Sequence, residues 1–246
     1  MKCDFCDSEN SEGAAFCARC GSRLEGAGVV TVSPDWEENG GWFRIPSFFI
    51  TVREVLFTPS STFSRVKTDN RIFNACLFGI IGGSIGILFG SLWQTVVDWR
   101  KFIPQYSDVP DVFHGLSYWL AMLLIAPSVA VLAQLISAGI VHVCLMIAGG
   151  AKRGFAVTFR VVAYAYGATA LLSLIPVLGA VAGFIWLVAV EALGLKEAHR
   201  ITLGKSLFAV FLPFVFCCFC CAVIVGGMVF AGISLAGLTG LFTQLK

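Results

Sequence analysis

Five long apolar runs restrict this chain to one class of fold. They cover about residues 72–97, 118–148, 158–175, 178–195 and 206–237, and of the charged residues only Arg160 and Glu191 lie inside them. A helix needs about 20 apolar residues to cross the hydrocarbon core of a bilayer, and the shorter third and fourth runs suffice if they form a tight hairpin. Only 13% of the residues are charged, against about 25% in ordinary globular domains. We therefore predict an all-α membrane protein with five transmembrane helices.

The basic residues predict the orientation of these spans. With a cytosolic N-terminus, the outer segments contain only Arg100, Lys101 and Lys246. The inner segments then contain Lys2, Arg19, Arg23, Arg44, Arg53, Arg65, Lys67, Arg71, Lys152, Arg153, Lys196, Arg200 and Lys205. Because inner loops of membrane proteins are rich in Lys and Arg, this predicts a multi-pass protein of the cytoplasmic membrane with its C-terminus outside. The first twenty residues lack the apolar segment of a signal peptide, and the formal charge of +2 gives no reason to expect nucleic acid as a partner.

Two CxxC pairs precede the apolar body. They are Cys3-Asp-Phe-Cys6 and Cys17-Ala-Arg-Cys20. Four thiolates complete a tetrahedral site for a structural Zn²⁺ ion and leave no open position for catalysis, and disulfides are rare in a reducing cytosol. We predict a zinc ribbon over residues 1–24, a flexible linker over 25–46 and a five-span domain over 72–246. Residues 47–71 between them form either an interfacial helix or a simple connector.

Polar residues within the spans are few, so each is a candidate functional residue. Glu191 falls opposite about Ala163 in a hairpin of the third and fourth spans, one turn from Arg160 and within reach of a salt bridge. The pair is either a polar site open to the cytosol or a buried ion pair that locks the hairpin, and the two side chains could instead reach the interface. The complete candidate set is Arg160, Glu191, Gln134, His142 and His199. No constellation of a nucleophile and a base accompanies it, so we predict no enzymatic activity.

Small residues repeat at helical spacing and predict close helix packing, within the chain or in a homo-oligomer. The predicted packing glycines are Gly82, Gly86, Gly90, Gly179, Gly183 and Gly232. A second cysteine cluster, at residues 217–221, lies deep in the fifth run. Metal binding and lipidation are alternatives there, but we expect the thiols to serve as small packing residues.

Several short motifs of the body resemble the Yip family (Ypt/Rab-interacting membrane proteins). They are Pro59-x-x-x-Phe63 before the first span, Ala163-Tyr-Ala-Tyr-Gly-Ala, Ile175-Pro-Val-Leu-Gly179, Trp186, Glu197-Ala-His199 and Gly204-Lys-Ser. The resemblance covers residues 46–240 and implies the same five-span plan. Eukaryotic members of the family bind prenylated Rab GTPases, but the motifs for that role are not recognisable here. The resemblance therefore implies a prokaryotic type with an N-terminal zinc ribbon and no Rab binding.

Two functional hypotheses follow from these features. The first is a non-enzymatic membrane scaffold or adaptor whose cytosolic zinc ribbon recruits an unknown cytosolic protein. The second is an oligomeric channel or small-solute transporter, based on the glycine-rich spans and on Arg160, Glu191 and Gln134. A continuous polar path would favour the second hypothesis, whereas a closed apolar interior would favour the first.

Overall fold

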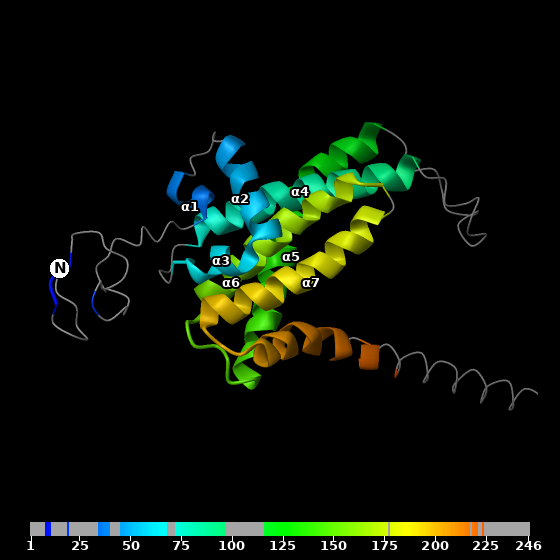
Figure 1. The fold of residues 1–246 in the computed structure, drawn as a ribbon. Helices are drawn as coiled ribbons and strands as arrows, with labels where there is room; N and C mark the ends of the chain where they lie inside the picture. Colours follow the sequence, from blue (N-terminus) through cyan, green and yellow to red (C-terminus); the bar gives the residue numbers. More distant parts are fainter. Residues whose placement is uncertain are drawn as a thin grey trace, which may run out of the picture.

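The computed structural model describes residues 8–10, 19, 34–39, 45–67, 72–96, 116–176, 178–216, 218–220 and 223. Three short helices precede the apolar body: α1 (Asp35–Asn39), α2 (Ile45–Phe57) and α3 (Pro59–Ser64). The body contains α4 (Phe73–Val96), α5 (Leu116–Ile147), α6 (Phe155–Ala170), which continues as the 3₁₀ turn η4 (Leu171–Leu174), and α7 (Leu178–His199). A further helix covers Leu203–Cys220. Figure 1 shows α4, α5, α6 and α7 running alongside one another.

Five of these helices are long and apolar enough to cross a membrane, as the sequence predicted. The spans are Phe73–Val96, Leu116–Ile147, Phe155–Leu174, Leu178–His199 and Leu203–Cys220. The third span starts three residues earlier than predicted, because Gly154, with a φ of 79°, ends the preceding turn and lets α6 begin at Phe155. Pro127 lies inside α5.

Helix α6 is the centre of the bundle and contacts α4, α5, α7 and α2. In its most apolar 18-residue stretch 67% of the residues are buried, against 33% in each of α4, α5 and α7. Two glycines of α4 permit this packing. A Cβ atom added at Gly86 would lie 2.7 Å from the carbonyl oxygen of Ala170, and one added at Gly82 would overlap the backbone of Gly167. The backbones of α4 and α6 are therefore in direct contact.

The outer surface of the bundle is strongly apolar. Large hydrophobic side chains of α5 and α7 are exposed along most of each helix, as on a surface that faces lipid. On α5 they include Leu120, Leu123, Leu124, Ile125, Leu132, Ile136, Ile140, Val143, Met146 and Ile147. The interior is filled by small residues such as Ala163, Ala165 and Ala168 of α6. This distribution is the one expected for a helical membrane domain.

The segment before the first span is part of the body over its described residues, which differs from the flexible linker predicted for residues 25–46. Residues 35–39 form α1, and Trp36 is only 4% exposed. The indole of Trp36 donates a hydrogen bond to the Asn74 carbonyl at 2.8 Å and packs edge-on against Phe48 and Phe78. The backbone N–H of Trp36 donates to the Thr51 hydroxyl at 3.0 Å. Because both N–H groups of Trp36 are hydrogen-bonded, this residue fixes α1 on α2 and α4.

Candidate functional site

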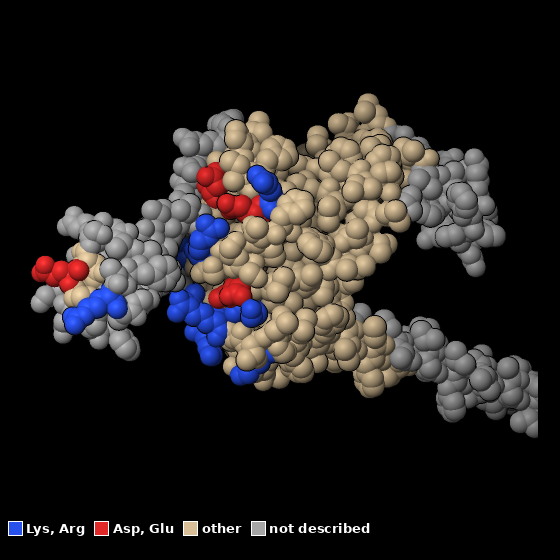
Figure 2. All heavy atoms as spheres, in the orientation of Figure 1, with Lys and Arg blue, Asp and Glu red and all other residues tan. Residues whose placement is uncertain are grey.

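Charged side chains gather at one end of the bundle, here called the polar end (Figure 2). It is formed by α1, α2, α3, residues 148–154 and residues 196–205. Apart from the charged residues among the described residues 8–10 and 19, the rest of the described surface in this view is uncharged. Two charged residues of the described spans lie further into the bundle than this end, namely Arg160 and Glu191. Both are at least 95% buried. Any polar chemistry of the described residues is therefore concentrated at this end.

Arg160, on the second turn of α6, forms an ion pair with Glu37 of α1. The Nε atom lies 3.0 Å from Glu37 Oε1, although the N–H does not point along a hydrogen bond. The Nη1 group donates to the backbone carbonyl of Lys67. One turn further along α6, the Tyr164 hydroxyl faces the same carboxylate. Burying a charge is costly unless an opposite charge and hydrogen bonds accompany it, and Glu37 supplies the opposite charge.

The ion pair between Arg160 and Glu191, one of the alternatives that the sequence left open, is not formed in the structure. Glu191 is 5% exposed on α7, and no described residue forms an ion pair with it. The prediction compared only the register of neighbouring spans. It could not include Glu37, because residues 25–46 were expected to be a free linker. The sequence did carry one signal, the pairing of a tryptophan with acidic residues at 35–38 within a stretch that is otherwise rich in glycine and proline.

Three helices are joined at the polar end by a chain of hydrogen bonds through Thr158. The His142 Nδ1 atom of α5 lies 2.8 Å from Thr158 Oγ1, which lies 3.0 Å from His199 Nε2 of α7. The backbone N–H of Arg153 donates to His199 Nδ1 at 3.3 Å. Because a backbone N–H can only donate, Nδ1 of His199 must accept, and its proton is on Nε2. His199 then donates to Thr158, while the direction of the bond between Thr158 and His142 depends on the His142 tautomer.

Gln134 of α5 forms a separate contact with α4. It is fully buried, and its Nε2 atom donates to the Cys76 carbonyl at 3.3 Å. Its side-chain oxygen occupies the space beside Gly79, where a Cβ atom would overlap it. The five candidate residues therefore do not form one site. Arg160 pairs with α1, His142 and His199 share Thr158, Gln134 bonds α4, and Glu191 belongs to none of these groups.

The predicted packing glycines also differ in what surrounds them. Gly179 lies against the Leu172 carbonyl and closes the turn between α6 and α7, and a Cβ atom on Gly183 would lie 3.1 Å from the Thr169 carbonyl. Nothing lies within 4 Å of a Cβ atom added at Gly90. Gly232 is outside the described residues. Of the predicted glycines that are described, all except Gly90 contact another segment of the same chain.

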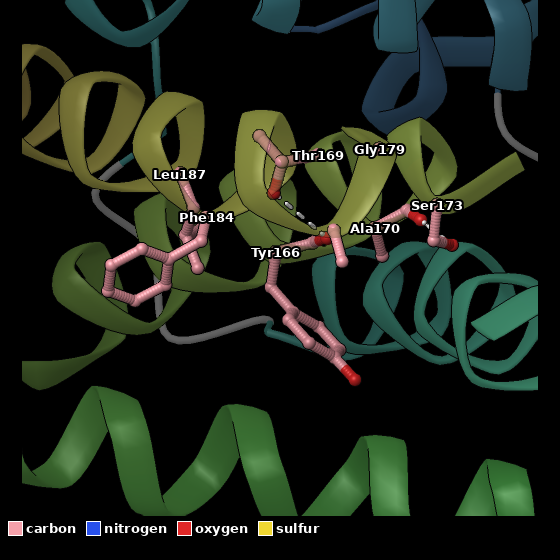
Figure 3. A pocket seen from close by; sticks show the side chains of 9 residues that line it. Tyr166, Thr169, Ala170, Ser173, Gly179, Phe184 and Leu187 are labelled. Atoms are coloured by element: carbon pink, nitrogen blue, oxygen red, sulfur yellow. Dashed lines mark hydrogen bonds between the residues drawn. The ribbon is translucent and has the colours of Figure 1, made fainter. Parts of the chain in front are cut away.

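A cavity of about 200 Å³ lies between α6, η4 and α7 (Figure 3). Two of its hydroxyl groups are bonded to helix carbonyls: Ser173 donates to Ala170 at 2.6 Å and lies 3.0 Å from the Gly86 carbonyl, and Thr169 donates to Ala165 at 2.7 Å. The other lining residues include Phe184 and Leu187. None of its lining residues is charged, and none carries a carboxylate, imidazole or thiol that could bind a metal ion.

Metal ligands do not come together in the described part of the chain. No group of three or more His, Cys, Asp or Glu side chains there could hold a metal ion. The predicted zinc ligands Cys3, Cys6, Cys17 and Cys20 lie outside the described residues, as do Cys217 and Cys221. Cys218 and Cys220 are free thiols.

Comparison with known proteins identifies the membrane body. The family model of the Yip1 domain matches residues 53–225. No curated protein matches the chain, and no solved structure matches it. The match starts within α2, includes all of α4, α5, α6 and α7, and ends beyond the described part of the last helix. With more than half of its length matched, and with five apolar helices in that length, the chain belongs to the Yip1 domain family of multi-pass membrane proteins.

Proposed function

We propose that this protein is a non-enzymatic membrane scaffold whose N-terminal zinc ribbon holds a cytosolic partner against the bilayer. The polar end faces the cytosol in this proposal, with the N-terminus inside and the C-terminus outside. The basic residues of the inner segments support this orientation. The donor set of Cys3, Cys6, Cys17 and Cys20 fits Zn²⁺, because four thiolates satisfy a tetrahedral structural site.

The observation that carries the proposal is the fixation of α1 on the membrane body. Trp36 and Glu37 attach residues 35–39 to α2, α4 and α6. Only residues 21–34 separate α1 from the last ribbon cysteine. Such a segment spans at most about 50 Å when fully extended. A partner held by the ribbon is therefore confined to the membrane surface near the polar end, which is the task of an adaptor.

The described interior favours a scaffold over a pore. The buried polar groups bond locally to neighbouring helices, and α4 and α6 touch along their backbones. The cavity between α6 and α7 contains no charged group. A conducting path needs a series of polar or wettable positions along the membrane, and the described residues of α4 to α7 do not supply one.

The test uses the full chain in its native membrane. Replacing all four ligands, Cys3, Cys6, Cys17 and Cys20, with Ser should abolish in-cell crosslinking to cytosolic proteins, read by quantitative mass spectrometry. The control is the double variant Cys218→Ser/Cys220→Ser, which changes cysteines of the body and should retain the crosslinks. The same crosslinks in wild type and in the ligand variant would refute the adaptor role. Solute flux through reconstituted wild-type protein would favour the transporter instead.

A further inference from the structure

Two loops of the polar end are held together by hydrogen bonds. Residues 148–154 join α5 to α6, and residues 200–202 join α7 to the last helix. The Arg153 N–H donates to His199 Nδ1 at 3.3 Å, and Lys205 Nζ donates to the Gly149 carbonyl at 3.1 Å. The side chains on these loops are therefore fixed beside one another, and are not spread over independent segments.

The two loops and the residues that flank them carry four cations and no carboxylate. Residues 148–155 and 199–206 contain Lys152, Arg153, Arg200 and Lys205 but no Asp or Glu. Within the described residues, none of the four forms an ion pair, and the adjacent Glu197 binds Lys196 at 2.8 Å instead. Burial, and then the charge of Arg200, lower the pKa of Arg153. Two guanidinium groups thus lie within electrostatic reach of each other without a neutralising acid in the described structure.

The backbone at Arg200 is in a conformation that normally requires glycine. Its φ is 52°, and it is the one described non-glycine residue with a positive φ. The N–H of Ile201 donates to the Lys196 carbonyl at 3.0 Å and the N–H of Arg200 donates to the Glu197 carbonyl at 3.2 Å, which is the pattern of a Schellman C-cap. An arginine at this position strains the chain where a glycine would not. A binding role of the Arg200 side chain would explain why this strained conformation is kept.

Two further features adjoin these cations. Helix α6 begins directly after Arg153, with Gly154 as an N-cap that has no side chain and with no acidic residue in the first turn. The positive end of its dipole is therefore added to the cations. Exposed apolar side chains border the same loops: Ile147 is 67% exposed, Leu203 is 42% exposed and Phe155 is 39% exposed. An anion bound here would have apolar surface next to it.

We propose that Arg153 and Arg200 bind the phosphate of an anionic membrane lipid, with Lys152, Lys205 and the start of α6 adding positive charge. Guanidinium groups present paired N–H donors that match phosphate oxygens. The loops end the membrane-spanning helices, at the depth where lipid headgroups lie. Ile147, Phe155 and Leu203 are placed to contact the acyl chains, which favours a lipid over a soluble phosphate.

The binding test uses the full-length protein in neutral detergent. The probes are short-chain phosphatidic acid, short-chain phosphatidylcholine and inorganic phosphate, with binding measured by titration. We expect phosphatidic acid to bind at least about tenfold more tightly than the other two. Each Lys or Arg near an anionic lipid contributes about fivefold, so Arg153→Gln/Arg200→Gln should weaken binding by about 25-fold.

The matched control removes the same charge from the same end of the bundle. Lys67→Gln/Lys196→Gln replaces two cations outside the two loops and should change the affinity less than about threefold. Equal losses in both double variants would show a diffuse surface field and overturn the specific site. Equal affinity for inorganic phosphate and phosphatidic acid would overturn the lipid as the ligand.

A single variant separates binding from folding. Arg200→Gly removes the cation but suits the positive φ, so the thermal unfolding midpoint should stay the same or rise while phosphatidic acid affinity falls about fivefold. Retained affinity in Arg200→Gly would refute the assignment of Arg200. A lower unfolding midpoint in Arg200→Gly would refute the argument that Arg200 keeps its strained backbone conformation because its side chain binds lipid.

Discussion

Arg160 of α6 and Glu37 of α1 form an ion pair, with 3.0 Å between Nε and Oε1, at a point where both side chains are at most 5% exposed. The two residues come from the central membrane helix and from the short helix that precedes the first span. The neutralisation of a charge inside the bundle thus depends on a segment outside the spans.

Glu37→Gln should destabilise the protein by about 3–5 kcal/mol, because it removes the negative charge that lies 3.0 Å from the buried guanidinium of Arg160. The measurement is the free energy of unfolding by denaturant in detergent. Glu197→Gln is the control, since it breaks the exposed pair with Lys196 and should cost at most about 1 kcal/mol.

The double variant Glu37→Gln/Arg160→Met tests the reason for that loss. It removes the cation together with the acid, so much of the stability should return. If the double variant is as unstable as Glu37→Gln alone, the loss does not arise from the buried charge of Arg160.

The spans could be predicted from the sequence because run length and hydropathy depend on local composition. The turn at Pro176 and the close approach of α4 to another helix follow from equally local patterns. The partner of Arg160 could not be predicted in the same way. Glu37 reaches α6 because Trp36 bonds Asn74 and Thr51, and these contacts join residues that are far apart in the chain.

The glycine pattern shows the same limit. Spacing of four residues marks one face of α4 but does not say how far the partner helix extends. Gly86 lies against Ala170, the last residue of α6, and Gly90 is one turn further along α4. The candidate polar residues were likewise found individually from their rarity in the spans, but their grouping around Thr158 and Glu37 needs the three-dimensional register.

Gly82→Ala should destabilise the bundle by about 1–3 kcal/mol, because the added methyl group would overlap the backbone of Gly167, which cannot move as a side chain could. Thermal unfolding in detergent measures the effect. Gly90→Ala has free space around the new methyl group and should leave the midpoint unchanged or slightly higher. A similar loss in both variants would mean that helix packing at Gly82 is not the cause.

Thr158→Val should cost about 1–3 kcal/mol, because it removes the hydroxyl that bonds both His199 and His142 while it keeps the shape of the side chain. The control is Thr169→Val, whose hydroxyl bonds the carbonyl of Ala165 in its own helix and should cost less. Denaturant unfolding distinguishes the two. Equal losses would argue against a structural role for the bond chain between α5, α6 and α7.

Glu54 of α2 should make stability depend on pH. Burial raises its pKa above the ordinary 4.5, with a smaller opposing effect from Arg65. A raised pKa means that the folded protein holds the proton more tightly, so this contribution is complete below pH 4.5 and is lost as the pH rises through the folded pKa.

Glu54→Gln imitates the protonated carboxyl and should therefore be more stable than wild type at pH 7. The difference should disappear as the pH falls below 4.5. The measurement is the unfolding midpoint of Glu54→Gln and of wild type in the same detergent, from pH 7 to below pH 4.5. A difference that does not change with pH would show that the charge of Glu54 is not responsible.

The proposed zinc ribbon should hold about one zinc ion per chain, because its four cysteines complete a single tetrahedral site. Zinc content of the purified protein, measured by elemental mass spectrometry, should fall to near zero when Cys3, Cys6, Cys17 and Cys20 are all Ser. Cys218→Ser/Cys220→Ser should retain the metal. Thermal unfolding of the membrane body should be similar in all three proteins, because the ligands precede α1 and the described body contains no metal-binding group. Zinc that stays with the ligand variant, or a wild-type protein without zinc under zinc-replete expression, would refute the ribbon.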